Sequence, residues 1–164
     1  MLNNEKYASF MEQLSETVKD ELLRKFMYEE FLVAYVHSFR YEKEPRVNNQ
    51  NGVKIAHSRY TWEDKVYRDF MFSILSSLEP ICFKKNEILY DELDEFHSVI
   101  YIMHSEYHIG YTINKKQYFK IKMMHQDVGA YGMTFKKRSE FIYKAQKDCE
   151  GFFIRRKNWI EIYK

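Results

Sequence analysis

The chain has 164 residues, of which 45% are hydrophobic and 30% charged, a balance typical of a folded protein and not of a disordered one. The formal net charge is only +2, so no general positive field predicts binding to nucleic acid. Its 2 cysteines, Cys82 and Cys149, are too few and too far apart for a disulfide framework or a CxxC metal site. Met1–Phe10 has no signal-peptide pattern, and no apolar run approaches the roughly 18 residues of a membrane span. We therefore expect a soluble intracellular piece, which is compatible with a fragment of a membrane protein.

The first part of the chain has the apolar spacing of helices. Ser15 is a typical N-cap, and Glu16 suits the first turn of a helix that begins there. Apolar residues recur at every fourth position: Leu14, Val18, Leu22 and Phe26. A second helix is expected over Tyr28–Arg40, joined to the first almost without a linker.

A third helix is expected after a loop. Tyr41–Ser58 contains a proline, a glycine and a run of amide side chains, which together mark a loop. Thr61 and Asp64 form a start that resembles a capping box, and Pro80 ends the helix. The apolar stripe of this helix comprises Trp62, Val66, Phe70, Ile74 and Leu78.

Short extended segments replace the helical pattern after Pro80. Segments rich in Ile, Val, Tyr and Phe predict strands over Glu87–Asp91, Ser98–Met103, Glu106–Ile113, Gln117–Met124, Ser139–Ala145 and Gly151–Arg155. Asn114–Lys116 predicts a hairpin turn, and Arg156–Tyr163 predicts the start of a closing helix. The predicted fold class is α+β, with an N-terminal helical segment followed by a jelly-roll-like β-roll.

Few residues have the spacing of a catalytic or metal site. His104 and His108 share a face of a strand or helix, but no third ligand is placed beside them. The acidic run Asp91–Glu95 lacks the glycine of a calcium loop and favours a solvated turn. The short basic clusters Lys115-Lys116 and Lys136–Arg138 favour solvated loops. We expect no enzyme, no metal site and no nucleic-acid partner, with a metal-dependent enzyme on the same topology as an alternative.

The segment Asp127–Ser139 is the most informative candidate for a ligand site. It combines two glycines, a predicted short helix and then Arg138 at the start of a strand. Backbone N–H groups at a helix N-terminus and an opposing guanidinium are one way in which proteins hold a phosphate. A tight loop with an exposed arginine is the alternative, and the residues alone favour neither.

Several short segments from Tyr60 onward form a specific pattern when taken together. They are Tyr60–Asp64, Leu78–Pro80, Tyr90–Glu95, Gly110–Lys116, Arg138–Lys144 and Gly151–Arg155. In these segments the chain resembles the cyclic-nucleotide-binding homology domain of voltage-gated, ether-à-go-go-like potassium channels, most closely their ciliate branch. Leu14–Arg40 resembles the helical C-linker that joins such a domain to the pore. The resemblance implies a β-roll flanked by helices, a tetrameric channel and gating modulated from the cytosol.

The resemblance also assigns candidate ligand-binding residues: Val128, Gly129, Ala130, Arg138 and Ser139. Nucleotide-binding members have Phe-Gly-Glu where this chain has Val128-Gly129-Ala130, so the glutamate that would hold the ribose hydroxyl is missing. In an ungapped alignment with these members, Ser139 takes the position of the arginine that binds the phosphate, and Arg138 lies one residue before that position. At two positions where these members have a glycine in the β-roll, this chain has Leu93 and Ser105. A buried hydroxyl without its acceptor costs about 1–3 kcal/mol, which is about one to two decades in affinity.

The resemblance implies a cytosolic regulatory (gating) domain of a voltage-gated potassium or cation channel with a degenerate ligand cassette. The alternative is a functional cAMP- or cGMP-binding regulatory domain, and no other cofactor is expected. Residues 1–60 are expected to form the C-linker-like segment and residues 61–164 the β-roll domain. The expected partners are the other subunits of the tetramer, contacted through the aromatic-rich helices of Leu14–Arg40. The expected location is the cytoplasmic face of a membrane, reached only through the parent pore.

The cassette is expected to hold no nucleotide. A partly buried guanidinium needs a partner, so we expect Arg138 to pair with a carboxylate of this chain. The carboxylates considered are Glu140, Asp127 and Glu150. Tyr131 or Met133 is expected to occupy the space of the purine.

Overall fold

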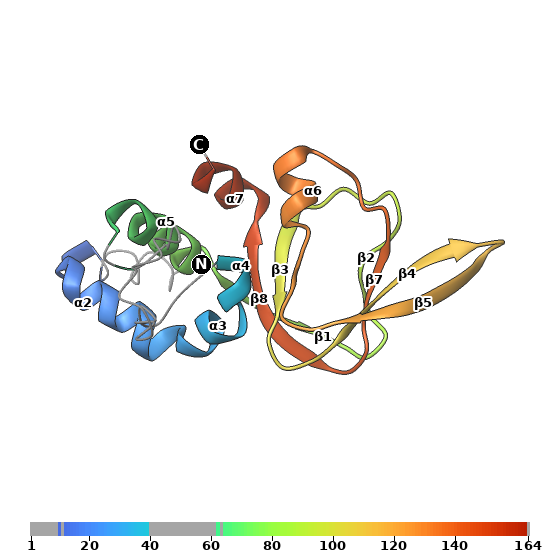
Figure 1. Cartoon of the computed structure of the whole chain (residues 1–164), viewed down its shortest axis with the longest axis horizontal. Helices are drawn as coiled ribbons and strands as arrows, with labels where there is room; N and C mark the ends of the chain where they lie inside the picture. Colours follow the sequence, from blue (N-terminus) through green and yellow to red (C-terminus); the bar gives the residue numbers. More distant parts are fainter. Residues whose placement is uncertain (1–9, 11, 40–61, 63, 164) are drawn as a thin grey trace, which may run out of the picture.

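A computed structural model describes residues 10, 12–39, 62 and 64–163 of the chain. Figure 1 shows helices gathered on one side of a β-roll, with a long hairpin that projects from the opposite side. This architecture confirms the expected α+β class, because helices come first and an antiparallel β-roll follows. Across these residues no helix is both long enough and apolar enough to span a membrane. The expected loop Tyr41–Ser58 lies outside the described residues.

The N-terminal region is a chain of short helical elements. They are α2 (Glu16–Glu21), the π-helix η1 (Leu22–Met27), α3 (Glu29–Ala34) and α4 (Val36–Phe39). Ser15 caps α2 as predicted, because its hydroxyl oxygen accepts from the N–H of Val18 at 3.4 Å. Tyr28 alone separates η1 from α3, and Tyr35 divides the second predicted helix into α3 and α4.

The apolar stripe expected on the first helix is wrong. Val18 and Phe26 are exposed, whereas Leu23 is buried. In η1 the N–H of Tyr28 donates to the carbonyl oxygen of Leu23 at 2.9 Å, an i→i+5 bond. Such a turn holds more residues than an α-helical turn, so the side chains rotate away from the four-residue pattern.

Helix α5 spans Lys65–Ser76 and begins at Asp64, not at Thr61, which lies outside the described residues. The Asp64 carboxylate accepts from the N–H groups of Val66 at 2.8 Å and Tyr67 at 3.1 Å. The expected stripe is confirmed at Ile74, but Val66 is 80% exposed. A strict four-residue spacing drifts by about 40° per step around the helix, so Val66, two steps before Ile74, turns to solvent.

The β-roll consists of two four-stranded sheets within the described residues, ordered β1-β8-β3-β6 and β2-β7-β4-β5. The strands are β1 (Glu79–Phe83), β2 (Ile88–Tyr90), β3 (Ser98–Ile102), β4 (Tyr107–Ile113), β5 (Lys116–Met123), β6 (Asp127–Val128), β7 (Ile142–Ala145) and β8 (Cys149–Arg155). All predicted strands are present, and the predicted closing helix is α7 (Arg156–Ile162). Asn114 and Lys115, with φ of 50° and 63°, form the predicted turn between β4 and β5.

Two strands, β1 and β6, were not predicted. Pro80 was expected to end a helix, but α5 ends at Ser76 and Pro80 lies within β1, paired with Phe152. An edge strand tolerates proline because the missing N–H would face solvent, and β1 is at the edge of its sheet. The two residues of β6, Asp127–Val128, are too few to show an alternating pattern.

Aromatic residues of α3 and α4 pack against the sheet β1-β8-β3-β6 and join its core. The ring centroid of Phe31 lies 5.2 Å from that of Tyr101 on β3 and 5.8 Å from that of Phe152 on β8. The hydroxyl of the buried Tyr35 donates to the carbonyl oxygen of Ile102 at 2.8 Å. Phe31 and Tyr35, two of the aromatic residues of the helices that were expected to contact other subunits, are therefore buried against the chain's own sheet. The chain's own sheet supplies the surface that two short helices lack.

Candidate functional site

The candidate ligand segment connects β6 to β7 through the short helix α6 (Ala130–Phe135). Gly129 caps this helix with φ of +100°, a left-handed conformation that other residues rarely adopt. A Cβ atom at this position would lie 2.9 Å from a ring carbon of Phe96 and 2.9 Å from the carbonyl oxygen of Ser98. Both the backbone conformation and the space therefore require the glycine.

Val128 and Ser139 hold the ends of the segment and do not line a cavity. Val128 is buried in β6, opposite Ile100 of β3. Ser139 is also buried, and its hydroxyl donates to the carbonyl oxygen of Phe141 at 2.6 Å. Its N–H donates to the carbonyl oxygen of Asp94 at 2.9 Å. These two candidate residues therefore have structural roles at the positions where the structure places them.

Gly129 and Arg138 line the same small cavity, whose volume is about 180 Å³. The structure thus brings these two candidate residues together, as a phosphate site would require. Asp127 and Glu140 also line the cavity, opposite in charge to Arg138 and Lys137. The formal charges around the cavity therefore cancel, and no net positive field points into it.

The Arg138 guanidinium already has partners within the chain. Its Nη1 donates to the carbonyl oxygen of Leu93 at 3.2 Å, and its Nη2 donates to Oε1 of Glu95 at 3.1 Å. Arg138 was expected to pair with a carboxylate, and it does, but the partner is not one of the three considered. Glu95 is brought beside Arg138 by an isolated backbone bridge between the two residues. No local spacing in the sequence indicates that long-range pairing.

Asp127 places a carboxylate close to the N-terminus of α6. Burial raises the pKa of Asp127, while hydrogen bonds from the backbone N–H groups of Ala130 and of Asp127 itself lower it in part. The Ala130 N–H is one of the amides that an anion at this helix terminus would use. The chain's own carboxylate therefore takes up part of the hydrogen-bonding capacity that a phosphate needs.

Aromatic side chains occupy the region beside α6. The Phe96 ring is buried beneath Gly132, where a Cβ would lie 2.2 Å from it, and its centroid lies 4.7 Å from that of Tyr90. Tyr131 lines the small cavity but is 67% exposed, and Met133 is buried elsewhere under the helix. The ring beside Gly132 is therefore Phe96 and not Tyr131 or Met133, which were expected to fill the site of the purine. Local sequence does not indicate Phe96, because more than thirty residues separate it from α6.

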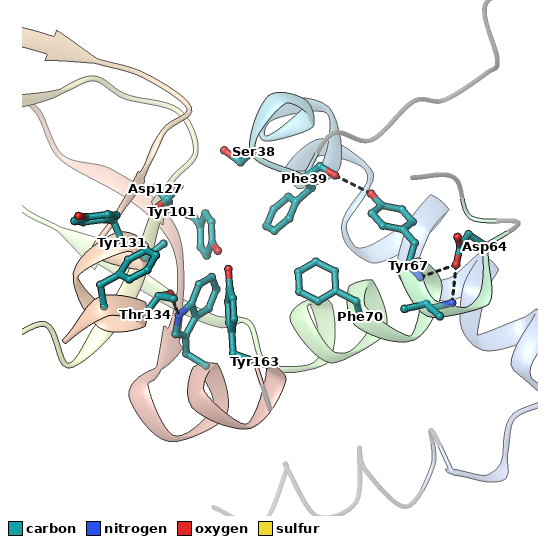
Figure 2. A pocket seen from close by; sticks show the side chains of 14 residues that line it. Ser38, Phe39, Asp64, Tyr67, Phe70, Tyr101, Asp127, Tyr131, Thr134 and Tyr163 are labelled. Carbon is teal, nitrogen blue, oxygen red and sulfur yellow. Dashed lines mark hydrogen bonds between the residues drawn. The ribbon is translucent and has the colours of Figure 1, made fainter. Parts of the chain in front are cut away.

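A second, larger cavity of about 750 Å³ lies between α4, α5, α6, α7 and the sheet. Figure 2 shows Phe39, Phe70, Tyr101 and Tyr163 turned toward one another from different elements around it. Ala130, the fifth candidate ligand residue, lines this cavity and not the small one. Nothing in the sequence pattern indicated this cavity, because its walls come from segments far apart in the chain.

The histidine pair and the acidic run do not form a metal site. Among the residues that the structure describes, no group of three or more His, Cys, Asp or Glu side chains could hold a metal ion. His104 Nδ1 lies 3.6 Å from Oε1 of Glu30. The acidic run forms the expected turn, in which the N–H of Asp91 donates to the Asp94 carboxylate at 2.7 Å. Leu93, at a position that the resemblance assigns to glycine, has φ of 68°.

Comparison with known proteins gives matches by structure and none by sequence: neither a family model nor a curated protein matches the chain. The cAMP-bound PfPKA-R fragment 141–441 superimposes with a TM-score of 0.61 at 13% identity, over 84% of this chain and 42% of that one. The regulatory domain of Toxoplasma gondii PKA with cAMP gives a TM-score of 0.54 at 9% identity, over 59% of this chain and 39% of that one.

A third solved structure is the regulatory subunit of a cAMP-independent protein kinase A from Trypanosoma cruzi bound to guanosine. It gives a TM-score of 0.52 at 10% identity, over 58% of this chain and 34% of that one. This chain therefore spans about two fifths or less of the length of these structures. At such identities the likeness is one of fold. The chain has the fold of the cyclic-nucleotide-binding regulatory domains in these structures.

Proposed function

We propose that the chain is a regulatory module whose cyclic-nucleotide cassette holds cAMP and cGMP weakly or not at all. The main support for the proposal is the hydrogen bonding of Arg138, whose guanidinium donates to the Glu95 carboxylate and to the Leu93 carbonyl oxygen. A cyclic phosphate would have to displace these contacts before it could use the arginine. Ala130 stands where the resemblance places the glutamate for the ribose, so a bound nucleotide would also lack that acceptor.

The size and charge of the small cavity support the proposal. Its volume is about 180 Å³, whereas cavities for small molecules usually measure about 300–1,000 Å³. The carboxylates of Asp127 and Glu140 line it and would repel a phosphate. The neighbour from Trypanosoma cruzi is described as cAMP-independent, so a module of this fold need not depend on cAMP.

Thermal unfolding with and without nucleotide tests the proposal. A ligand present at one hundred times its dissociation constant adds about 2.7 kcal/mol of stability, which raises the melting temperature of a chain of this size by about 5–10 °C. With 1 mM cAMP or cGMP we expect no measurable rise. A rise of several degrees that disappears in Arg138→Ala would support the alternative, a functional nucleotide-binding domain.

A repaired cassette provides the matched control for that measurement. The double variant Glu95→Gln and Ala130→Glu frees the Arg138 guanidinium from its carboxylate and restores the glutamate that the resemblance assigns to the ribose, at a position that lines the larger cavity. We expect this variant to gain a nucleotide-dependent rise in melting temperature that the natural chain lacks. If both proteins show the same rise, Glu95 and Ala130 are not what limits binding, and the proposal is wrong.

We further propose that the module is the cytosolic gating domain of a tetrameric voltage-gated potassium or cation channel, at the cytoplasmic face of the membrane. The support is the resemblance described above, with residues 1–60 as the C-linker-like segment and residues 61–164 as the β-roll domain. The packing of α3 on the roll gives the two regions a direct contact through which such gating would act. Phe26 and Val33 remain exposed on the helices and offer an apolar surface to a neighbouring subunit.

Recording of membrane currents from the longer parent protein tests the channel proposal. We expect a voltage-dependent cation current whose half-activation voltage shifts in the variant Phe26→Ser. Lys147→Ser, in the turn between β7 and β8, serves as the control and should leave the voltage unchanged. A parent protein that stays in the soluble fraction of the cell, or that carries no current, would contradict the channel proposal but not the weak nucleotide binding.

A further inference from the structure

The large cavity of Figure 2 differs from the cassette in both size and charge, and we propose that it binds an organic ammonium ion with an aromatic body. Its volume of about 750 Å³ falls within the range of about 300–1,000 Å³ that is usual for small-molecule sites. The inference concerns a different cavity from the cassette and does not rest on the function proposed above.

Aromatic rings form most of the cavity walls. Phe39, Tyr67, Tyr101 and Trp159 are buried and form its deep part, while Tyr131 and Tyr163 are largely exposed at its rim. The faces of aromatic rings attract cations, and Trp and Tyr do so most strongly. The walls therefore suit a ligand that has both an apolar body and a positive charge.

The charged residues that line the cavity all have the same sign. Asp127 and Asp64 line it, and no Lys, Arg or His is among the described lining residues. A cyclic nucleotide or any other anion would meet only carboxylates there. A cation would gain a favourable interaction with the Asp127 carboxylate, whereas Asp64 is exposed and caps the N-terminus of α5 at the other end of the cavity.

The hydroxyl of Tyr101, at the wall of the cavity, is a suitable contact for the polar end of the ligand. Tyr101 is 1% exposed, and its hydroxyl makes no hydrogen bond to any residue that the structure describes. A tyrosine hydroxyl can both donate and accept, so this group is available to a ligand or to water in the cavity. Tyr101 on β3 and Asp127 on β6 are paired residues of neighbouring strands, so their side chains leave the sheet on the same face.

Two other polar side chains around the cavity, Tyr67 and Trp159, have partners within the chain. The Tyr67 hydroxyl donates to the carbonyl oxygen of Phe39 at 3.2 Å, a bond drawn in Figure 2. The Trp159 Nε1–H donates to the Thr134 hydroxyl at 3.1 Å. We assign the ammonium to Tyr101 and Asp127, which lie side by side on neighbouring strands, so that it donates to the hydroxyl oxygen and to the carboxylate.

Titration of the full chain with three probes of one shape tests the proposal. The probes are phenethylammonium, neutral propylbenzene and anionic 3-phenylpropanoate, followed by the shifts of backbone amide NMR signals. We expect saturable binding of phenethylammonium, with shifted signals at Tyr101, Asp127 and Thr134. The other two probes should bind at least about tenfold more weakly, because they lack the charge that the carboxylates and rings attract.

Single substitutions identify the groups that hold the charge. Asp127→Asn should weaken binding of phenethylammonium about tenfold, and Tyr101→Phe should weaken it about threefold. Asp148→Asn, which changes an exposed carboxylate that does not line the cavity, is the matched control and should have no effect.

A substitution of Tyr131 at the rim provides a second test in case a variant with a buried substitution does not fold. Tyr131 is 67% exposed, so Tyr131→Ala should fold and should weaken phenethylammonium binding several-fold. The proposal is overturned if the three probes bind equally, or if no probe saturates the chain. Unchanged affinity in the folded variants Asp127→Asn and Tyr131→Ala would also overturn it.

Discussion

At the scale of single residues, Gly129 is the position where the candidate segment is most sensitive to substitution. Its φ of +100° and the 2.9 Å approach to Phe96 and Ser98 leave no place for a side chain. We predict that Gly129→Ala lowers the free energy of unfolding by about 1–3 kcal/mol, measured by urea denaturation. Leu93→Gly is the opposite control: Leu93 has φ of 68°, so glycine there should raise stability by about 1 kcal/mol. An unchanged stability in Gly129→Ala would show that the turn at this position differs from the one described.

Asp127 makes the stability of the chain depend on pH. Burial raises its pKa above the value of 3.8 that applies to an unfolded chain, so the folded state holds the proton more tightly. The contribution of Asp127 to the stability of the folded state is therefore fully present below pH 3.8. This contribution is lost as the pH rises through the folded-state pKa. We predict that Asp127→Asn melts at a higher temperature than the natural chain at pH 7. The difference should amount to about 1.4 kcal/mol for each pH unit of the shift and should vanish near pH 3.

Asp148 provides the control with the opposite sign. The N–H of Lys85 and the side chain of Lys84 lower the pKa of Asp148, so its charged form stabilises the folded state above the unfolded pKa. Asp148→Asn should therefore melt at a slightly lower temperature than the natural chain at pH 7 and at the same temperature near pH 3. If Asp127→Asn and Asp148→Asn change the melting temperature in the same direction, the burial assigned to Asp127 is wrong.

At the scale of elements, the docking of α3 on the roll is the contact that joins helices and sheets. Phe31 is buried among the rings of Tyr101 and Phe152, whereas Phe26 on η1 is 78% exposed. We predict that Phe31→Ala lowers the free energy of unfolding by about 3–5 kcal/mol. Phe26→Ala should change it by less than about 0.5 kcal/mol. Both are measured by urea denaturation, and similar losses in the two variants would contradict the packing of α3 on its own roll.

Most of the elements could be predicted because their patterns are local. The Ser15 cap, the apolar run in β3 and the turn at Asn114 each depend on a few neighbouring residues. The π-helix η1 could not be predicted, because its register follows from packing and not from propensity. The strand β1 could not be predicted because it contains Pro80. A proline is tolerated in a strand only at the edge of a sheet, and the position of β1 at an edge depends on the whole fold.

The candidate site was predictable only in part, for the same physical reason. The glycine, the short helix and Arg138 lie within one stretch of chain, so their proximity is a local property. The carboxylate that binds Arg138 and the ring that packs under α6 come from Glu95 and Phe96, which only the closed roll brings near. A single sequence carries no signal for such long-range pairs.

At the scale of the whole molecule, α6 separates two cavities with different chemistry. On one side Arg138 is held by Glu95 beside a small cavity with balanced charge. On the other side a large aromatic cavity carries only acidic charge among its described residues. Asp127 lines both cavities, so its carboxylate disfavours an anion in each of them. The fold of cyclic-nucleotide-binding regulatory domains is thus combined with an arginine held by a carboxylate of the chain, on which the proposal of weak nucleotide binding rests.

Isothermal titration calorimetry of the full chain with cAMP and with cGMP tests this central claim most directly. The account predicts no binding, or a dissociation constant much weaker than about 10 μM, because Arg138 is engaged by Glu95 and the ribose acceptor is absent. Arg138→Ala should then give the same weak or absent heat signal as the natural chain. A dissociation constant at or below about 10 μM, which is about −7 kcal/mol, abolished by Arg138→Ala, would contradict the account.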